Sequence, residues 1–227
     1  MEKLESKIKI KFKNKDLLRQ ALVHRSYLNE NPEFELPHNE RLEFLGDAVL
    51  ELVVTDYLFK NLDKKEGEMT ALRAALVNTK MLAHVGRDIE IEDSIMLSQG
   101  EDKDKGRSRD SILANTIEAI IGALYMDQGY EASEKFISDN ILSELPRVLK
   151  ENLFIDAKSH FQELAQEKFS KTPHYSVLES SGPDHKKSFV VGVYIGEALI
   201  AKGEGRSKQE AEQEAARSAL DEKFSES

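Results

Sequence analysis

The sequence predicts two domains, an all-α domain followed by a small α+β domain with the element order α-β-β-β-α. Its 227 residues exceed one typical domain of ~100–150 residues. Apolar residues recur at helical spacing through residues 1–150, where strand patterns are nearly absent, and strand-like runs follow only in the last 70 or so residues. We therefore expect one domain at 1–150 and another at 156–225, joined by a linker at 151–155.

Apolar residues spaced as on one side of a helix predict the helices of the first domain. The clearest sets are Leu17, Leu18, Ala21 and Leu22; Leu42, Leu45, Val49 and Leu52; and Leu72, Ala75, Leu76 and Thr79. A further helix is expected from Ser111 to about Met126. The intervening segment 99–110 is polar, charged and contains glycine, which predicts an exposed loop.

The second domain begins with an expected helix at 157–169 and ends with another. The first should bury Phe161, Leu164, Ala165 and Phe169. Between the helices we expect strands at Tyr175–Glu179, Phe189–Tyr194 and Glu197–Glu204, the last two joined by a tight hairpin at Ile195 and Gly196. Ser207, followed by Glu210 three residues later, predicts a capping box at the start of the final helix.

Composition narrows the class of protein. The chain contains no cysteine, which excludes disulfides and thiolate zinc sites. It has no apolar run of the ~20 residues that span a bilayer, and its charged start lacks the apolar region of a secretory signal. We expect a cytoplasmic protein without membrane contact. The net charge of −10 means that any nucleic-acid contact must come from local basic clusters.

The most informative segment is HNERLEFLGDAVL at residues 38–50. On a helix, Glu40, Glu43 and Asp47 stand at i, i+3 and i+7 and share one face. Three carboxylates on one face repel one another unless a cation neutralises them. The opposite side of this helix is the apolar set that contains Leu42 and Leu52, so the helix is expected to pack on one side and present acids on the other.

A second polar pair interrupts the apolar segment LANTIEAIIG at residues 113–122. Asn115 and Glu118 stand at i and i+3, so they share a face among core-type neighbours. A glutamate in such surroundings needs a partner or a metal. Two helices that offer oxygen ligands can bind a hard divalent cation such as Mg²⁺. The alternative is that these acids form an ordinary solvated helix face, and spacing alone leaves both readings open.

Segment 38–50 closely resembles the signature sequence of the ribonuclease III family. The resemblance continues through LLRQALVHRSY at 17–27, EGEMTALRAALV at 66–77 and ILANTIEAIIGALYMDQG at 112–129. It implies a metal-binding cluster of Glu43, Asp47, Asn115 and Glu118, in which Asp47 and Glu118 are catalytic. It also implies that Glu40 and Glu66 help to hold a second metal or the substrate, and that Phe44 contacts a partner subunit. The family usually has aspartate at the position of Asn115.

The α-β-β-β-α segment resembles the double-stranded RNA-binding domain. The resemblance is carried by Gln162 and Glu163, by GPDHKKSF at 182–189 and by GEGRSKQEAEQEAA at 203–216. Such domains read the shape of A-form RNA across two minor grooves and the phosphates between them. The residues implied to contact RNA are Gln162, Glu163, Pro183, Asp184, His185, Lys186, Lys187, Arg206 and Lys208. The family often has a second lysine where this chain has Gln209.

The resemblance implies a homodimeric endonuclease that cuts double-stranded RNA with Mg²⁺, or with Mn²⁺ as a substitute. It implies 5′-phosphate and 3′-hydroxyl ends with a short 3′ overhang, structured ribosomal and messenger RNA precursors as substrates, and no small-molecule organic cofactor. One alternative is a dimer that binds duplex RNA without cutting it, which Asn115 favours. Another is a phosphohydrolase of small molecules, which the second domain disfavours because a small substrate needs no duplex-spanning module.

Overall fold

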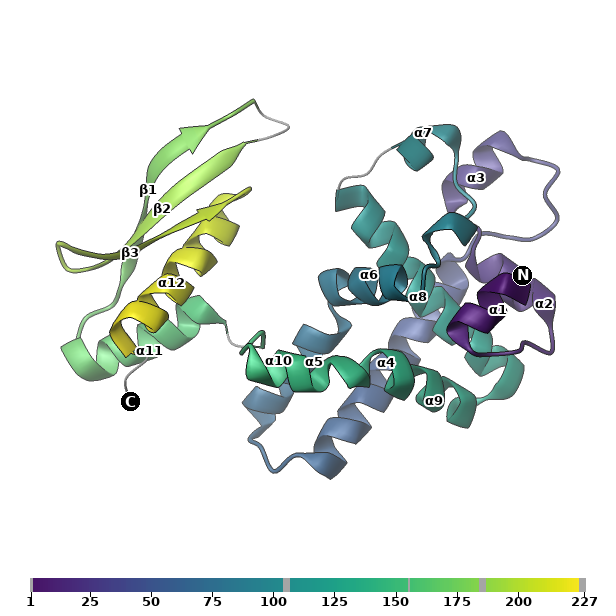
Figure 1. Ribbon diagram of the computed structural model, residues 1–227, viewed down its shortest axis with the longest axis horizontal. Coiled ribbons are helices and arrows are strands. Elements are labelled where there is room, and N and C mark those ends of the chain that lie inside the picture. Colours follow the sequence, from purple (N-terminus) through teal and green to yellow (C-terminus); the bar gives the residue numbers. More distant parts are fainter. Residues whose placement is uncertain (1, 104–106, 155, 184–186, 225–227) are drawn as a thin grey trace. The chain divides into compact units, whose positions relative to one another are not determined.

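The chain forms two compact units, Met1–Phe154 and Ile155–Ser227 (Figure 1). The computed structural model describes residues 2–103, 107–154, 156–183 and 187–224. The first unit is helical, and the second contains a three-stranded antiparallel sheet with two helices. The predicted fold class, an all-α domain followed by an α-β-β-β-α domain, is therefore confirmed.

The first unit is built from short helices arranged around two long ones. The long helices are α4 (Glu40–Asn61) and α8 (Arg107–Gln128). The others are α1 (Glu2–Ile8), α2 (Lys15–Ala21), α3 (Arg25–Glu30), α5 (Glu66–Val77), α6 (Thr79–Asp88), the 3₁₀ turn η1 (Glu92–Ser94), α7 (Gln99–Lys103), α9 (Tyr130–Asn140), the 3₁₀ turn η2 (Leu142–Glu144) and α10 (Leu145–Lys150).

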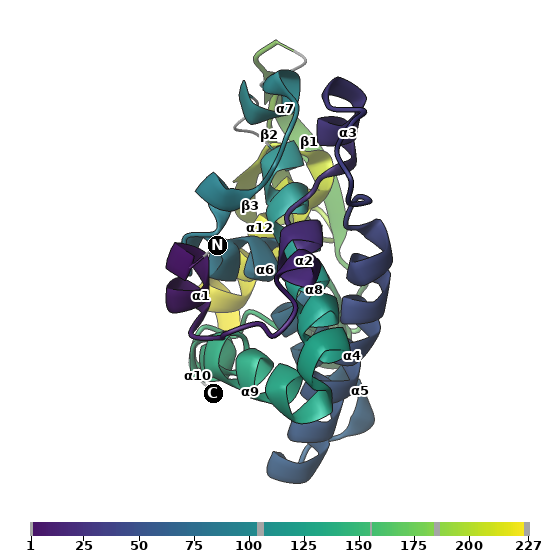
Figure 2. The ribbon, with the colours of Figure 1, turned by 90° about the vertical axis from the view of Figure 1, so that its right-hand side faces the viewer.

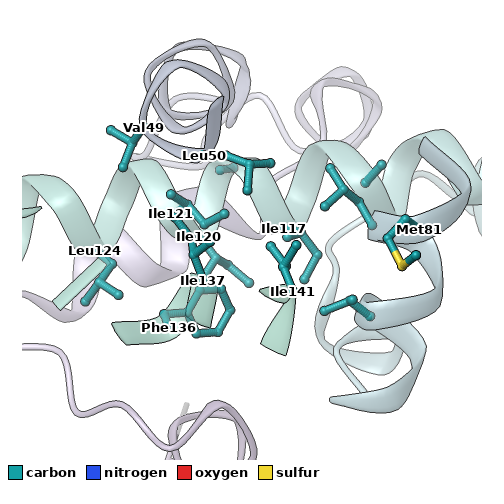
Figure 3. Packing of buried hydrophobic residues seen from close by; sticks show 14 of the residues in the cluster. Val49, Leu50, Met81, Ile117, Ile120, Ile121, Leu124, Phe136, Ile137 and Ile141 are labelled. Atoms are coloured by element: carbon teal, nitrogen blue, oxygen red, sulfur yellow. The ribbon is translucent and has the colours of Figure 1, made fainter. Parts of the chain in front are cut away.

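Helices α4 and α8 lie side by side in the first unit (Figure 2). Helix α8 carries buried apolar residues on several of its sides, and among them Ile117, Ile120 and Ile121 are fully buried. Figure 3 shows these residues between Leu50 of α4 and Phe136 of α9. Burying each such side chain contributes roughly 1.5–3 kcal/mol, so α8 is the main support of the fold.

Within the described residues, no helix is both long enough and apolar enough to cross a membrane.

Two expectations for the first unit were wrong. Leu52 is 57% exposed, because α4 carries apolar side chains on more than the side that faces the core. Segment 99–110 is not simply a loop: α7 occupies its first part and α8 begins at Arg107, with residues 104–106 outside the described part. Tertiary contacts order this segment, since the Gln99 amide donates to Glu30 Oε2 at 3.1 Å and Arg109 Nε donates to Glu92 Oε1 at 2.7 Å.

The second unit packs two helices on one face of its sheet. Helix α11 (Ala157–Phe169) is followed by strands β1 (His174–Ser181), β2 (Ser188–Ile195) and β3 (Ala198–Gly205) and by helix α12 (Lys208–Phe224). The strands pair in the order β1-β2-β3. Alternate residues of β2, Val191 and Val193, are fully buried under the helices together with Phe161 and the alanines of α12. The expected strands are therefore confirmed, each slightly longer or shifted at its ends.

The structure corrects the expected hairpin turn and the expected burial of Phe169 in the second unit, and it confirms the expected helix cap. The hairpin turn is formed by Gly196, with φ of 63°, and Glu197, rather than by Ile195 and Gly196. Ser207 Oγ accepts from the Glu210 amide at 3.1 Å, and the Glu210 carboxylate accepts from the Arg206 amide at 2.9 Å, which confirms the cap. Phe169, expected to be buried, is 49% exposed because α11 ends there, with Ser170 in the left-handed conformation.

Candidate active site

The backbones of α4 and α8 touch where each helix carries a glycine. A Cβ atom built on Gly46 would lie 1.7 Å from the backbone oxygen of Glu118, and one built on Gly122 would lie 2.1 Å from the backbone oxygen of Leu42. No other residue type leaves space for this approach. The two glycines therefore set the crossing of the helices, and they do so next to the carboxylates of both.

The start of α4 is held in place by Asn39, which is buried. Its backbone amide donates to the Val23 oxygen at 2.9 Å, and its side-chain amide donates to the Ala21 oxygen at 3.3 Å. These bonds attach α4 to the end of α2 one residue before Glu40. The acidic face of α4 therefore projects from a fixed helix end, which is what a preorganised binding site requires.

The crossing brings together Glu43 and Asp47 of α4 with Asn115 and Glu118 of α8. The Asn115 side chain donates a hydrogen bond to the Glu43 carboxylate. Glu118 is within electrostatic reach of both acids of α4, whose charges raise its pKa. Asp47 is exposed, whereas the other three residues are partly buried. The four side chains that the sequence pattern and the family resemblance singled out thus lie near one another across two helices.

Burial is the main cause of the raised pKa of the Glu118 carboxyl. It raises the pKa of this carboxyl to about 7, with smaller contributions from Asp47 and Glu43. Burial also raises the pKa of Glu43, helped by Glu40 and Asp47 and opposed by the hydrogen bond from Asn115. A buried carboxylate among like charges is costly unless a cation accompanies it, so this cluster is suited to binding one.

This electrostatic cost predicts a pH-dependent stability. Because the pKa of Glu118 is higher in the folded than in the unfolded chain, proton binding by this carboxyl stabilises the folded state. This stabilisation is fully present below the ordinary pKa of glutamate and is lost as pH rises through about 7. In EDTA, Glu118→Gln should therefore be more stable than the natural protein at pH 8, by on the order of 1–2 kcal/mol, and nearly equal at pH 5. Urea unfolding at both pH values measures this, with the exposed Glu131→Gln as control. Equal stability of natural protein and Glu118→Gln at pH 8 would show that Glu118 carries no such cost.

Glu40 and Glu66 lie at the edge of this arrangement. Glu40 begins α4 and stands between Arg25 Nη1, 3.6 Å from its Oε1, and His38 Nδ1, 3.7 Å from its Oε2. Glu66 is the exposed first residue of α5, and nothing in the described residues joins its carboxylate to the cluster. The donor atoms of Glu43, Asp47 and Glu118 do not all come within 4.8 Å of one another, whereas one other group of described side chains does.

The residues expected to contact RNA lie at three places on the second unit. Gln162 and Glu163 are exposed on α11, where they line a shallow depression with Gln166 and Glu167. Pro183 and Lys187 lie in the β1–β2 loop and are exposed, while Asp184, His185 and Lys186 lie outside the described residues. Arg206 and Lys208 are exposed on either side of Ser207 at the start of α12, where the helix dipole favours an anion.

Sequence reasoning missed the two residues that assemble the site, Gly46 and Gly122. The available signal was an isolated glycine inside each of two otherwise apolar helical segments, FLGDAVL and AIIGALY. Glycine in a helix interior costs up to about 1 kcal/mol relative to alanine, so its presence there indicates a packing or functional reason.

Each of the two units matches a known protein family. A family model described as Ribonuclease-III-like matches residues 14–145, and one described as double-stranded RNA binding motif matches residues 157–223. Ribonuclease 3 from Nitratiruptor sp. is 43% identical over 97% of this chain and 95% of its own length. Ribonuclease 3 from Carboxydothermus hydrogenoformans is 45% identical over 96% of this chain and 93% of its own.

The first unit is also similar to a solved structure. It is the nuclease domain of ribonuclease III from Campylobacter jejuni, described as flexible in a region involved in dimer formation. It is 42% identical, with a TM-score of 0.57, over 64% of this chain and 98% of that one. The chain therefore belongs to the ribonuclease III family and is a ribonuclease III-type endonuclease with a double-stranded RNA-binding domain.

Proposed function

We propose that the protein hydrolyses phosphodiester bonds of double-stranded RNA in a reaction that requires Mg²⁺, with Mn²⁺ as a substitute. The observation that carries the proposal is the crossing of α4 and α8, which gathers two carboxylates and an amide around a partly buried Glu118. The double-stranded RNA binding motif of the second unit supports the class of substrate.

The donor set of the cluster fits a hard divalent cation. Carboxylate and amide oxygens are the ligands that Mg²⁺ takes in proteins, and the mutual repulsion of Glu43, Asp47 and Glu118 is relieved by a positive charge. When bound, such a cation would supply a more acidic water and charge neutralisation at the phosphate. In this proposal Asp47 and Glu118 are catalytic, Glu43 and Asn115 complete the ligand set, and Glu40 and Glu66 hold a second cation or the substrate.

Asn115 favours a second candidate function. As an amide it holds Glu43 by a hydrogen bond but adds no negative charge, and the number of charged ligands tunes cation affinity. A site weakened in this way would leave a dimer that binds duplex RNA without cutting it. We favour the nuclease because Glu43, Asp47 and Glu118 are all in place.

The test is incubation of the full-length protein with a labelled RNA hairpin and with a single strand of the same length. The proposal expects cutting of the hairpin alone in Mg²⁺ or Mn²⁺, none in EDTA, and products with 5′-phosphate and 3′-hydroxyl ends and a short 3′ overhang. Precursors of ribosomal RNA and some messenger RNAs are the proposed natural substrates. Tight binding of the hairpin without cutting in either metal would establish the second candidate instead.

Binding of RNA by the second unit is proposed to use α11, the β1–β2 loop and the start of α12. The basic residues Lys186, Lys187, Arg206 and Lys208 would contact phosphates, while Gln162, Glu163 and the loop residues Pro183, Asp184 and His185 would reach the minor grooves. Because few basic residues are available, we expect a shallow dependence of affinity on salt.

Replacing Lys208 with alanine should remove about one phosphate contact. The slope of log affinity against log salt concentration should fall by about 1, with weaker binding of every duplex sequence. Fluorescence anisotropy at several salt concentrations measures this. Lys202→Ala, at an exposed position of β3, is the matched control and should leave the slope unchanged. An unchanged slope in Lys208→Ala would remove this residue from the RNA interface.

Dimer formation is proposed to involve α4. Phe44 is 82% exposed, Leu52 57% and Phe59 74%, and their spacing of i, i+8 and i+15 places them on one side of the helix. Large apolar side chains exposed on one helix face indicate a contact surface. A dimer of two such units would combine two clusters and so cut both strands of one duplex.

Phe44→Ala should weaken the proposed dimer by roughly thirtyfold or more, as expected for an aromatic side chain central to an interface. Sedimentation equilibrium over a range of protein concentrations measures the dissociation constant. Phe169→Ala, an exposed phenylalanine of the second unit, is the control. A chain that is monomeric before the substitution, or equally dimeric after it, would contradict this role of Phe44.

A further inference from the structure

A second group of polar side chains gathers on the first unit away from α4. His84 and Asp88 stand one turn apart on α6, and Glu144 ends η2. His84 Nε2 lies 3.4 Å from Asp88 Oδ2 and 3.8 Å from Glu144 Oε2. Among the described residues, this is the one group of three histidine or acidic side chains whose donor atoms all lie within 4.8 Å of one another.

The spacing of these atoms suits a shared cation better than direct hydrogen bonds. An N–H···O hydrogen bond typically spans about 2.7–3.2 Å, and both distances from His84 are longer. Bonds of about 2.0–2.2 Å to a tetrahedral Zn²⁺ place neighbouring ligand atoms roughly 3.4 Å apart. The His84–Asp88 distance equals this separation, and the His84–Glu144 distance exceeds it by an amount that a small side-chain rotation removes.

The chemistry of the group selects the kind of cation. One imidazole nitrogen and two carboxylates suit Zn²⁺ and similar transition metals, whereas Mg²⁺ prefers oxygen ligands alone. Arg147 Nε donates to Glu144 Oε2 at 2.7 Å and so orients this carboxylate, as hydrogen-bond partners of metal ligands commonly do. The nearby Arg87 pairs with Asp110. The side chains of His84 and Asp88 are about half exposed, so solvent can complete the coordination.

We propose that His84, Asp88 and Glu144 form a Zn²⁺ site that is separate from the acidic cluster of α4 and α8. The site joins α6 to η2, two segments more than fifty residues apart in the chain. Because the ligands meet only in the folded protein, binding of Zn²⁺ stabilises the first unit by mass action. Its role is therefore structural, and RNA cleavage does not depend on it.

The test compares Zn²⁺ binding in variants of the full-length protein. All carry Glu118→Gln to weaken binding at the acidic cluster, and all are stripped with EDTA and dialysed. Calorimetric titration with Zn²⁺ should show a site whose affinity falls by roughly tenfold or more in His84→Ala. His174→Ala, an exposed histidine of the second unit, should bind as the parent does. Zn²⁺ should also raise the melting temperature of the parent and of His174→Ala but not of His84→Ala.

A second variant keeps the test decisive if His84→Ala fails to fold. Asp88→Asn retains the shape of the side chain and removes one charged ligand, so it too should bind Zn²⁺ more weakly. In the otherwise natural chain, His84→Ala should cut duplex RNA in Mg²⁺ at the natural rate. Equal Zn²⁺ affinity of the parent and both variants would overturn the proposal and leave the group as a cluster of ion pairs.

Discussion

Gly46→Ala is expected to destabilise the first unit by about 3 kcal/mol or more and to abolish cleavage of duplex RNA. The added methyl group would lie 1.7 Å from the backbone oxygen of Glu118, so the helices must separate. Separation moves Glu43 and Asp47 away from Asn115 and Glu118. Thermal unfolding should show a melting temperature lower by about 10 °C, and activity should stay lost well below it.

A matched control for this substitution exists on α5. Gly67 is also helical, but a Cβ atom there meets nothing within 4 Å. Gly67→Ala should therefore keep or slightly raise the melting temperature, because alanine favours helix more than glycine does. If Gly46→Ala melted at the same temperature as Gly67→Ala and kept its activity, α4 and α8 could not meet at the glycines as described.

Glu118→Gln is expected to lower the rate of duplex cleavage by roughly a hundredfold to a thousandfold while leaving RNA affinity unchanged. The substitution retains the size of a side chain that is partly buried beside Asp47 and Glu43 but removes its charge. Single-turnover cleavage of a hairpin in Mg²⁺ measures the rate, and anisotropy in Ca²⁺ or EDTA measures binding.

The control for the lost charge is Glu131→Gln, at an exposed position in the first turn of α9. It should cut and bind as the natural protein does. A Glu118→Gln protein that cuts at the natural rate would remove this residue from the catalytic set. A loss of RNA binding in parallel with cleavage would instead assign Glu118 to substrate contact.

The spacing of apolar residues predicted where the helices lie better than it predicted which of their side chains are buried. The apolar spacing in α4 and α8 identified both helices, because each must bury one side. The same spacing placed Leu52 in the core, although it is 57% exposed on the side of α4 that also carries Phe44 and Phe59. An apolar residue that packs in a core and one that serves a surface contact look the same in a single sequence, so only the tertiary structure separates them.

The candidate site could be predicted helix by helix but not as an assembly. Spacing alone placed Glu43 and Asp47 on one face of α4, and Asn115 and Glu118 on one face of α8. The meeting of these faces depends on backbone contact at Gly46 and Gly122, a property of the pair of helices that neither helix displays alone. The family resemblance implied that the two faces belong to one site, and the glycine contact gives its physical cause.

Cleavage of the protein backbone by bound Fe²⁺ tests most directly whether one cation lies between α4 and α8. Fe²⁺ that replaces Mg²⁺ produces radicals with peroxide and ascorbate, which cut the chain close to the metal. We predict fragments that end near residues 43–47 and near 115–118 together, suppressed by excess Mg²⁺ and absent in Glu118→Gln. Fragments from only one of these helices, or cuts at both that Mg²⁺ and Glu118→Gln leave unchanged, would contradict a shared metal site at this crossing.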